Sequence, residues 1–242
     1  MRFLRAIVMA LATRLGVVGL LIAAVSGFGG LRQAAAQDNP AAVTVGADLE
    51  FKTRYLFAGI PFSAGEVIQA KITVGHAGWT LNAFTNYDLE AEEFSEGDVW
   101  AEYYHQFNDK VGGFLGAALY NFKIAASWEP TVELYAGLTA NLPGNPTLYF
   151  AHDFALTTGN HVTFTLSHGI PVEAATVSVA GNIDYNNGYY REGSSLSYAD
   201  LNVSVTVPVG DVTLTPMLTL QEGLHEDFED QVLGSIKLHV DF

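Results

Sequence analysis

Hydrophobic and polar residues alternate one by one along most of the chain beyond residue 42. The C-terminal segment QVLGSIKLHVDF shows the pattern, because Val232, Ile236 and Phe242 fall on one parity and Lys237 and Asp241 on the other. Alternation over about ten residues is the period of a β-strand with one apolar and one polar face. The pattern therefore predicts strands.

Twelve segments of this kind follow one another, separated by residues typical of turns. The expected strands span residues 43–55, 67–76, 79–89, 98–108, 112–122, 131–141, 146–156, 161–171, 175–186, 196–209, 212–222 and 231–242. Connections after even-numbered segments are short, such as HAG and GD. Those after odd-numbered segments are mostly longer and acidic, such as LFAGIPFSAGE, EAEEFSEG and KIAASWEP. An even strand number with such connections is typical of outer-membrane barrels. We predict an all-β fold, a twelve-stranded antiparallel transmembrane β-barrel with short periplasmic turns and longer outer loops.

A soluble β-sandwich or barrel is the alternative, since alternation is equally natural there. A soluble barrel that is polar inside and apolar outside would be inside out, which favours the membrane. Aromatic residues agree with two belts at the membrane interfaces. The outer rim is expected to hold Phe51, Tyr55, Tyr87, Trp100, Tyr120, Phe122 and Tyr185, and the inner rim Trp79, Phe107, Phe114 and Phe242.

The first 36 residues have the layout of a secretory signal peptide. Arg2, Arg5 and Arg14 precede an apolar run, and Ala34–Ala36 gives a small-residue cleavage site. An uncleaved membrane anchor is the alternative. We favour cleavage, so that residues 1–36 are the signal peptide and residues 37–242 form the barrel domain.

Composition narrows the classes of partner. The chain has no cysteine, which excludes disulfides and thiolate chemistry. Cleavage would remove four of the 11 Lys and Arg residues and no acid, leaving seven cations, 26 anions and a formal charge of −19. Such a surface disfavours nucleic acid. No later segment is apolar for the length of a transmembrane helix, so a membrane location requires a barrel. We predict the cell outer membrane, with its lipid as the surroundings.

Two resemblances to known proteins support the predicted barrel. Phe242, preceded by apolar residues at every second position, resembles the terminal strand signal of bacterial outer-membrane proteins and implies the barrel assembly machinery as a partner. The stretch TRYLFAGIPFSAGEVIQAKITVGHAGWTLNAFTNY resembles the opening of the TorF-type porins and related Gram-negative outer-membrane barrels. Ala58 stands where that family carries arginine, while Gly59 keeps the turn. Segments 148–172 and 198–218 are similar to later hairpins. The resemblance implies a pore-like barrel and no particular substrate.

Charged residues on the polar parity point into the predicted lumen. Lys52 and Arg54 lie on the first strand, Lys71 on the second and Lys237 on the last, which closes onto the first. A lipid-facing cation would cost about 2–4 kcal/mol near the midplane, which supports this orientation. The acidic lining residues expected are Glu50, Asp88, Glu102, Glu133, Asp153, Asp184 and Asp200. A basic wall facing an acidic wall gives a transverse field that selects solutes by charge and dipole.

Salt bridges between strands are the alternative for these charges, with Lys237 pairing with Asp48 or Glu50. In the first outer loop, Gly59, Pro61 and Gly65 favour a tight reversal. Phe57 and Phe62 can fold over the mouth, although we favour anchoring at the membrane interface.

The sequence gives little evidence for a catalytic site or a metal site. Ser167–His168 and His152–Asp153 are neighbours on a strand and therefore face opposite sides, whereas a nucleophile and its base must lie within hydrogen-bond reach. No G-x-S-x-G motif is present. The acidic loop HEDFED (225–230) offers oxygen ligands for Ca²⁺, but solvation is the favoured interpretation. We predict no catalytic residue, metal or cofactor.

The predicted function is a porin-like channel for passive diffusion of ions or small polar solutes, with cation preference arising from acidic loops. A non-conducting barrel that acts through its loops, as an adhesin or scaffold, is the alternative, and an outer-membrane lipid hydrolase is a third possibility. The lumen decides between the first two, because Trp100, Tyr104, Tyr135 and Tyr149 point inward by parity and are large enough to fill it.

Overall fold

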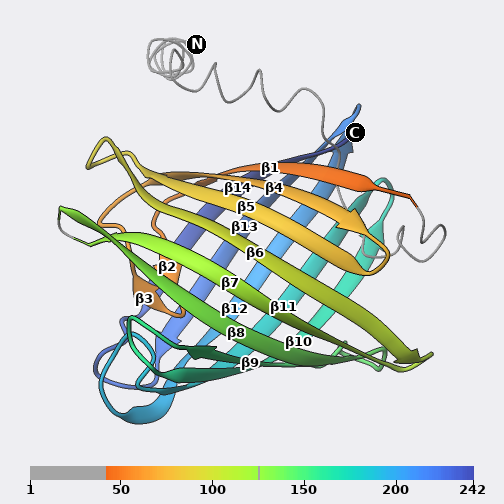
Figure 1. The fold of residues 1–242 in the computed structure, drawn as a ribbon. Helices are drawn as coiled ribbons and strands as arrows, with labels where there is room; N and C mark the ends of the chain where they lie inside the picture. The colour runs from red at the N-terminus through yellow and green to blue at the C-terminus, as the bar shows by residue number, and fades with distance from the viewer. Residues whose placement is uncertain (1–41, 125) are drawn as a thin grey trace, which may run out of the picture.

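The computed structural model describes residues 42–124 and 126–242, and twelve of its strands close into one antiparallel barrel (Figure 1). The barrel strands are β1 (Thr44–Lys52), β4 (Val67–His76), β5 (Trp79–Asp88), β6 (Glu93–Asn108), β7 (Val111–Ile124), β8 (Ser127–Ala140), β9 (Thr147–Asp153), β10 (Asn160–Val172), β11 (Ala175–Asn187), β12 (Ser194–Val209), β13 (Val212–Gly223) and β14 (Gln231–Asp241). A small hairpin, β2 (Leu56–Phe57) and β3 (Ile60–Pro61), lies between β1 and β4. The predicted fold is confirmed, whereas the predicted signal peptide lies outside the described residues. The described residues contain no helix long and apolar enough to cross a membrane.

Strand β1 closes the barrel by pairing with both β4 and β14. Its register with β14 runs from Gly46 opposite Asp241 to Lys52 opposite Ser235. Every other strand pairs with its neighbours in chain order. Closure leaves the barrel without an unpaired edge, so the backbone polar groups of the wall are satisfied within the protein, as a membrane requires.

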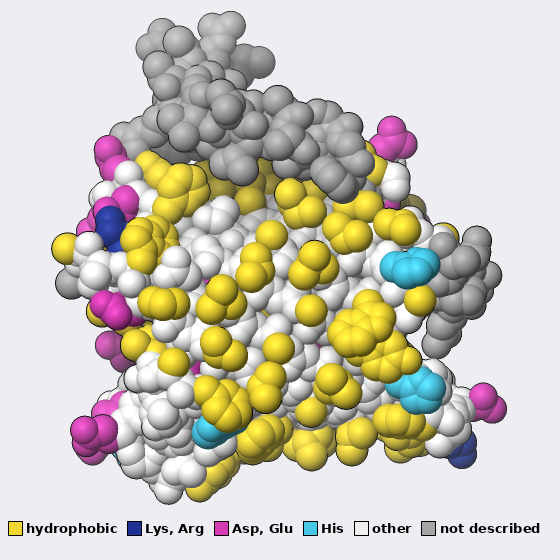
Figure 2. Space-filling view, in the orientation of Figure 1, with side chains coloured by type: hydrophobic (Ala, Val, Ile, Leu, Met, Phe, Trp, Pro, Cys, Tyr) yellow, Lys and Arg dark blue, Asp and Glu magenta, His cyan; other side chains and the backbone are white. Residues whose placement is uncertain are grey.

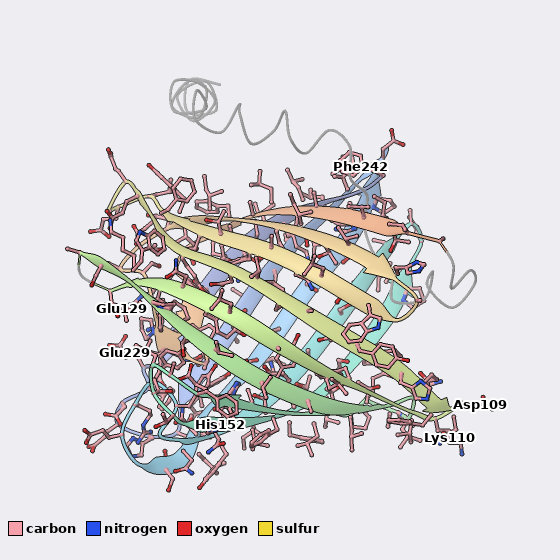
Figure 3. The ribbon with its side chains drawn as sticks, viewed as in Figure 1. Asp109, Lys110, Glu129, His152, Glu229 and Phe242 are labelled. Atoms are coloured by element: carbon pink, nitrogen blue, oxygen red, sulfur yellow. The ribbon has the colours of Figure 1, made fainter. Side chains whose placement is uncertain are left out.

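The two ends of the barrel differ. The turn end carries the N-terminal end of β1, the C-terminus and the turn at Asp109 and Lys110 (Figure 3). The loop end carries residues 53–66 and the connections on which Glu129 and Glu229 lie (Figure 3). The loop end is the one predicted to face outward.

Several strands run farther toward the loop end than predicted. The segments EAEEFSEG and KIAASWEP were expected to be loops, but β6 begins at Glu93 and β7 and β8 extend through most of the second segment. Glu96, in the extension of β6, is 2% exposed, and the adjoining inward residues Asp98 and Phe122 are 5% and 1% exposed. Contacts inside the barrel therefore stabilise strand where the acidic composition suggested solvated loop.

The outer wall is apolar over the middle of the barrel (Figure 2). Leu81, Leu115 and Leu134 are 59%, 58% and 49% exposed, and they share this face with many other large apolar side chains. A protein in water rarely exposes a contiguous apolar patch larger than a few hundred Å². The exterior is therefore the surface of a barrel embedded in lipid.

The aromatic residues near the rims divide between outside and inside. Trp79, Phe107 and Tyr185 are 53%, 57% and 42% exposed, as expected for interfacial rings. Five residues predicted for the rims instead lie inside the barrel: Tyr55, Trp100, Phe114, Tyr120 and Phe122. Phe114, Tyr120 and Phe122 have the inward parity of their strand, and Trp100 was also expected to point inward, so their assignment to the interfacial belts used height alone. Tyr55 has the outward parity of β1, but β1 ends at Lys52 and the chain then turns into the barrel.

Candidate pore and the hairpin within it

The β2–β3 hairpin folds into the lumen at the loop end (Figure 1). Phe57 reaches the opposite wall, where its ring centroid lies 5.4 Å from that of Tyr120 and 5.3 Å from that of Phe122 on β7. Phe62 lies 5.0 Å from Phe122. The favoured expectation that Phe57 and Phe62 anchor at the membrane interface is wrong, because burying two rings against inward-facing aromatics removes more apolar surface from water.

The tip of the hairpin is fixed against a second part of the wall. The carbonyl oxygen of Gly59 accepts a hydrogen bond of 3.2 Å from Nε2 of Gln221 on β13. Gly59 has φ +78°, and a Cβ at this position would lie 2.3 Å from the ring of Tyr198 on β12. Only glycine meets both the left-handed backbone and the close approach of that ring.

The base of the hairpin is held by polar contacts. Ser63 Oγ accepts a hydrogen bond of 2.8 Å from the Tyr55 backbone N–H, and the Tyr55 carbonyl accepts one of 2.9 Å from the Phe62 N–H. The Tyr55 hydroxyl donates to Glu96 Oε1 over 3.1 Å. The hairpin thus touches β6, β7, β12 and β13 as well as its own flanks.

The rings around the hairpin form one aromatic cluster, defined here as Phe57, Phe62, Tyr120, Phe122, Tyr189 and Tyr190. Tyr189 and Tyr190 come from the β11–β12 connection, which also folds inward. The Tyr190 hydroxyl donates to Asp153 over 3.2 Å. Burial, together with nearby Glu133 and Asp153, raises the pKa of Tyr189 and of Tyr190, so both hydroxyls stay protonated and able to donate.

Glu133 on β8 is the polar centre of this part of the wall. Its Oε1 accepts hydrogen bonds of 3.1 Å from the hydroxyls of both Tyr120 and Tyr149, and its Oε2 accepts one from Tyr189. The side chain is completely buried. Three hydroxyl donors compensate for the burial of one carboxylate, which ties the β11–β12 connection to β7, β8 and β9.

Farther from the loop end, large rings pack against the inner face of β6 to β9, and Trp100, Tyr104, Tyr135 and Tyr149 point inward as predicted. Tyr104 lies over Gly112, Tyr135 over Gly116 and Phe114 over Gly137, where added Cβ atoms would come within 2.1–2.3 Å of these side chains. Trp100 and Tyr149 pack against the same buried cluster, which includes Ala118 and Ala151. These rings thicken one side of the wall and leave the β12, β13, β14 and β1 side polar.

The four predicted basic residues lie on or next to that polar side. Lys71 pairs with Asp48 at 3.0 Å, and Lys52 makes a longer contact of 3.7 Å with Glu50. Arg54 contacts Glu229 at 3.4 Å and donates to the Ser63 carbonyl over 3.1 Å. Within residues 42–124 and 126–242, Lys237 makes no ion pair within 4 Å, although it lies opposite Glu50 in the β1–β14 register. Salt bridges, the alternative considered from the sequence, are therefore present for Lys52, Arg54 and Lys71, and the transverse field stays a prediction.

The predicted acidic residues differ from one another in burial and in hydrogen-bond partners. Glu133, Asp153 and Asp184 are completely buried behind the rings and hydroxyls of the wall. Asp153 accepts from Thr131 and from backbone N–H groups of the β9–β10 connection, and Asp184 accepts from His161 and Thr163. Asp88 accepts from the backbone N–H groups of Glu90 and Ala91 and shapes the β5–β6 turn. Glu102 lies beside Tyr135. Asp200 stays half-buried within the lumen. The pore-lining role of these residues stays a prediction.

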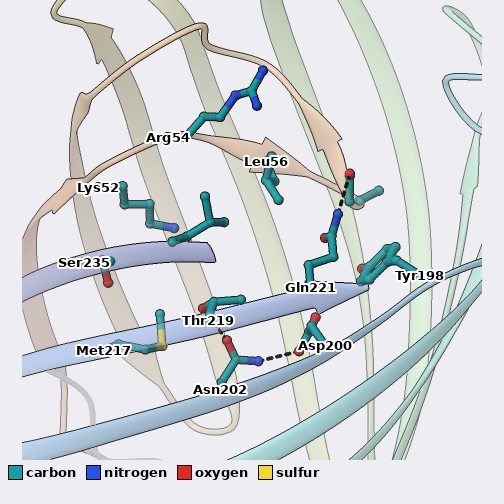
Figure 4. A pocket seen from close by; sticks show the side chains of 14 residues that line it. Lys52, Arg54, Leu56, Tyr198, Asp200, Asn202, Met217, Thr219, Gln221 and Ser235 are labelled. Atoms are coloured by element: carbon teal, nitrogen blue, oxygen red, sulfur yellow. Dashed lines mark hydrogen bonds between the residues drawn. The ribbon is translucent and has the colours of Figure 1, made fainter. Parts of the chain in front are cut away.

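A pocket of about 200 Å³ remains between the hairpin and the polar side of the wall (Figure 4). Lys52 and Arg54 border it on one side and Asp200 on the other. Leu56 and Gly59 of the hairpin form its cover. The loop end of the lumen is thus filled on its aromatic side and hollow on its polar side.

Sequence reasoning missed part of this arrangement. Glu96 was assigned to a loop, and Asp98, at the start of a predicted strand, was not named among the lining acids, although both are buried inside the barrel. Tyr189 and Tyr190 were treated as loop residues. Their signal was the pair of adjacent rings in NGYYREGSS, which is unusual for a solvated loop.

The pairs considered for catalysis do not form catalytic contacts. His152, placed toward the loop end in Figure 3, hydrogen-bonds Asn160 through Nδ1 at 2.7 Å. No hydrogen bond in the described part of the chain joins a serine or threonine hydroxyl to a histidine ring, and Ser167 uses its backbone N–H to donate to Gly144. That the chain is not an enzyme stays a prediction.

The acidic loop 225–230 is held by cations and rings. Asp227 lies 3.2 Å from Arg191, whose guanidinium carbon lies 5.3 Å from the centre of the buried Phe228 ring. Residues 42–124 and 126–242 contain no group of three or more His, Asp or Glu side chains arranged to hold a metal ion.

Comparison with known proteins gives the fold a context. No protein-family model and no curated protein matches the chain. Among solved structures, the KdgM porin superposes with a TM-score of 0.57 at 14% identity, covering 81% of this chain and 99% of that one. The NanC porin gives a TM-score of 0.53 at 11% identity, covering 81% and 98%. LpxR from Salmonella typhimurium gives 0.54 at 7% identity, covering 81% and 100%.

Each of these likenesses covers 81% of this chain, and at such identities they show the fold alone. The likenesses to solved structures do not test the resemblance to TorF-type porins, which stays a prediction. Together with the apolar outer wall, they show that the chain has the fold of a closed, twelve-stranded outer-membrane β-barrel.

Proposed function

We propose that the protein is a porin-like channel for passive diffusion of ions or small polar solutes, narrowed at its loop end by the β2–β3 hairpin. The observation that carries the proposal is the pocket of about 200 Å³ beside the hairpin, because it keeps the polar side of the lumen hollow at the level where the other side is filled. Charged side chains at such a constriction act on solutes at close range, where they are least screened. The KdgM and NanC porins share the fold, which supports the same class of function.

Cation preference is part of this proposal. Most acids of the loop-end connections are exposed, including Glu90, Glu92, Glu226 and Asp230. Figure 2 shows Asp and Glu side chains gathered along the left edge, which is the loop end. A negative mouth enriches cations and repels anions before they reach the constriction.

A planar lipid bilayer tests the proposal. Protein purified from membranes in detergent is expected to give discrete conductance steps. Under a KCl gradient, its reversal potential should be shifted from zero toward the K⁺ equilibrium potential. A barrel that inserts and resists heat but gives no steps would overturn the channel function.

A non-conducting barrel that acts through its loops is the second candidate, favoured by the aromatic cluster. Phe57 lies within 6.1 Å of four other rings of that cluster that come from β7 and the β11–β12 connection, so part of the loop end is packed like a core. The silent outcome in the bilayer, together with specific binding of the barrel to a surface or protein, would support this candidate.

A further inference from the structure

The pocket beside the hairpin carries opposite charges on its two sides. Lys52 enters it from the β1 side, where Arg54 also lines it, and Asp200 enters from β12 (Figure 4). Between them, β14 and β13 contribute Ser235 and Thr219. Register places Lys52 opposite Ser235, so the cation and this hydroxyl belong to one row of the inner wall.

The basic side has unused hydrogen-bonding capacity. Ser235 is 8% exposed, and its hydroxyl has no hydrogen-bond partner among residues 42–124 and 126–242. Within the described part of the chain, Glu50 is the single carboxylate within 4 Å of Lys52 Nζ, at 3.7 Å, which is too long for a hydrogen bond. A buried hydroxyl without a partner is unfavourable, because it has given up its hydrogen bonds to water and made none in return. An anionic group in the pocket would satisfy Ser235 and the Lys52 ammonium together.

The acidic side is fixed in place. Asp200 Oδ1 accepts hydrogen bonds from Nδ2 of Asn182 at 2.6 Å and of Asn202 at 2.5 Å. Asn202 is held in turn by Thr219, whose hydroxyl donates to its Oδ1 over 2.6 Å. Among residues 42–124 and 126–242, no donor contacts Asp200 Oδ2. Unlike Glu133 and Asp153, Asp200 therefore keeps an oxygen free for a solute.

These contacts select against solutes of a single charge. An anion drawn to Lys52 would enter the field of Asp200, and a cation drawn to Asp200 would enter that of Lys52 and Arg54. A solute with both charges gains at both sides. We propose that the pocket is a binding site for small zwitterions, with the carboxylate at Lys52 and Ser235 and the ammonium at Asp200.

The size of the pocket narrows the class. A volume of about 200 Å³ equals that of roughly seven liquid water molecules, which suits a small organic solute. Three strand spacings of about 4.8 Å separate β1 from β12, so the backbones of the two sides lie about 14 Å apart along the wall before side-chain reach is subtracted. The charges of the solute should be several bonds apart, as in an ω-amino acid or short peptide, rather than adjacent as in glycine.

This inference rests on the proposed channel function, and both are tested by block of single-channel current. The probes are 6-aminohexanoate, hexanoate and hexylammonium, which share a chain and differ in charge, with glycine as the short zwitterion. We expect 6-aminohexanoate to reach half-block at a concentration about tenfold below that of the other three. Equal block by all probes, or stronger block by hexanoate or hexylammonium, would overturn the zwitterion site while leaving the channel intact.

Two variants locate the site. Asp200→Asn should weaken block by 6-aminohexanoate about tenfold and leave hexanoate unchanged or stronger, which a merely structural defect would not do. Lys52→Met should weaken block by 6-aminohexanoate and hexanoate and spare hexylammonium. Lys110→Met, in the turn at the other end, is the charge-matched control and should change none of these values. If 6-aminohexanoate half-blocked both pocket variants at the same concentration as the wild type, the assignment of the site would be contradicted.

Binding can also be measured if the barrel proves silent. Saturation-transfer NMR on the folded protein in detergent, with the same four probes, should show transfer to 6-aminohexanoate that is reduced in Asp200→Asn. That result would support the site while the channel function fails. Equal or absent transfer for all four would overturn the site independently of conduction.

Discussion

The ring centroid of Phe57, in the hairpin that follows β1, lies 5.3 Å from that of Phe122 on β7, with the ring planes at 65°. This contact joins two walls of the barrel across the lumen. Edge-to-face rings contribute about 0.5–1.5 kcal/mol beyond the area they bury. The hairpin is therefore held inside the lumen by packing on its aromatic face, and this packing sets the width of the proposed channel.

Phe57→Ala should loosen the hairpin. The variant loses ring contacts with Tyr120, Phe122, Tyr189 and Tyr190 at a cost of about 2–3 kcal/mol, less than for a fully buried ring. We expect larger or noisier single-channel steps than in the wild type. Phe51→Ala, which removes a lipid-facing ring from β1, is the matched control and should conduct as the wild type does. Unchanged steps in both variants would show that the hairpin does not limit the current.

Gly59→Ala should expel the tip of the hairpin. The new methyl group would lie 2.3 Å from the Tyr198 ring, and φ of +78° adds strain of about 1 kcal/mol to overpacking of about 1–3 kcal/mol. Limited proteolysis of the folded barrel should cut within residues 53–66 more rapidly than in the wild type. Gly97→Ala, where an added Cβ meets nothing within 4 Å, is the control. Equal cleavage rates for the two variants would contradict the close packing at Gly59.

Replacement of Lys52 and Arg54 by alanine should sharpen cation selectivity. Both cations border the pocket, and their loss leaves Glu50 and Asp200 without these counter-charges. The reversal potential under a KCl gradient should move toward the K⁺ equilibrium potential, and less so at high salt because screening increases. Lys110→Ala at the turn end should leave it unchanged. A shift toward chloride would refute the lumen orientation of these charges.

Glu133→Gln should destabilise the loop end. The glutamine places an N–H₂ group among three tyrosine hydroxyls that now donate to the carboxylate, and it loses the charge that strengthens those bonds. The expected loss is about 1–3 kcal/mol in the free energy of unfolding. It can be read from the temperature at which the barrel loses its compact mobility in a detergent gel. Glu222→Gln, at an exposed position of β13, should unfold at the same temperature as the wild type.

The sequence was sufficient for the barrel because its signal is local and repeated. Each strand alternates between lipid and lumen, and β14 shows this from Val232 to Val240. The number of strands, their order and the inward direction of Lys52, Lys71 and Glu133 all follow from that alternation once the chain is placed in a membrane.

The position of the hairpin could not be predicted in the same way. Phe57 and Phe62 were recognised as candidates for the mouth or the interface, and both sites suit an aromatic ring. The choice depends on partners more than 50 residues away, Phe122 on β7 and Tyr190 in the β11–β12 connection, and periodicity carries no information on such contacts. The burial of Glu96 was missed for the same reason, since its partner Tyr55 lies on another segment.

The most direct test of the account is the single-channel conductance of the wild type beside a variant in which residues 56–61 are replaced by two glycines. The account predicts small steps for the wild type and clearly larger steps for the variant, with both proteins folded as heat-resistant barrels. Steps of equal size would show that the hairpin leaves the current unaffected. A folded variant without steps would contradict the channel itself.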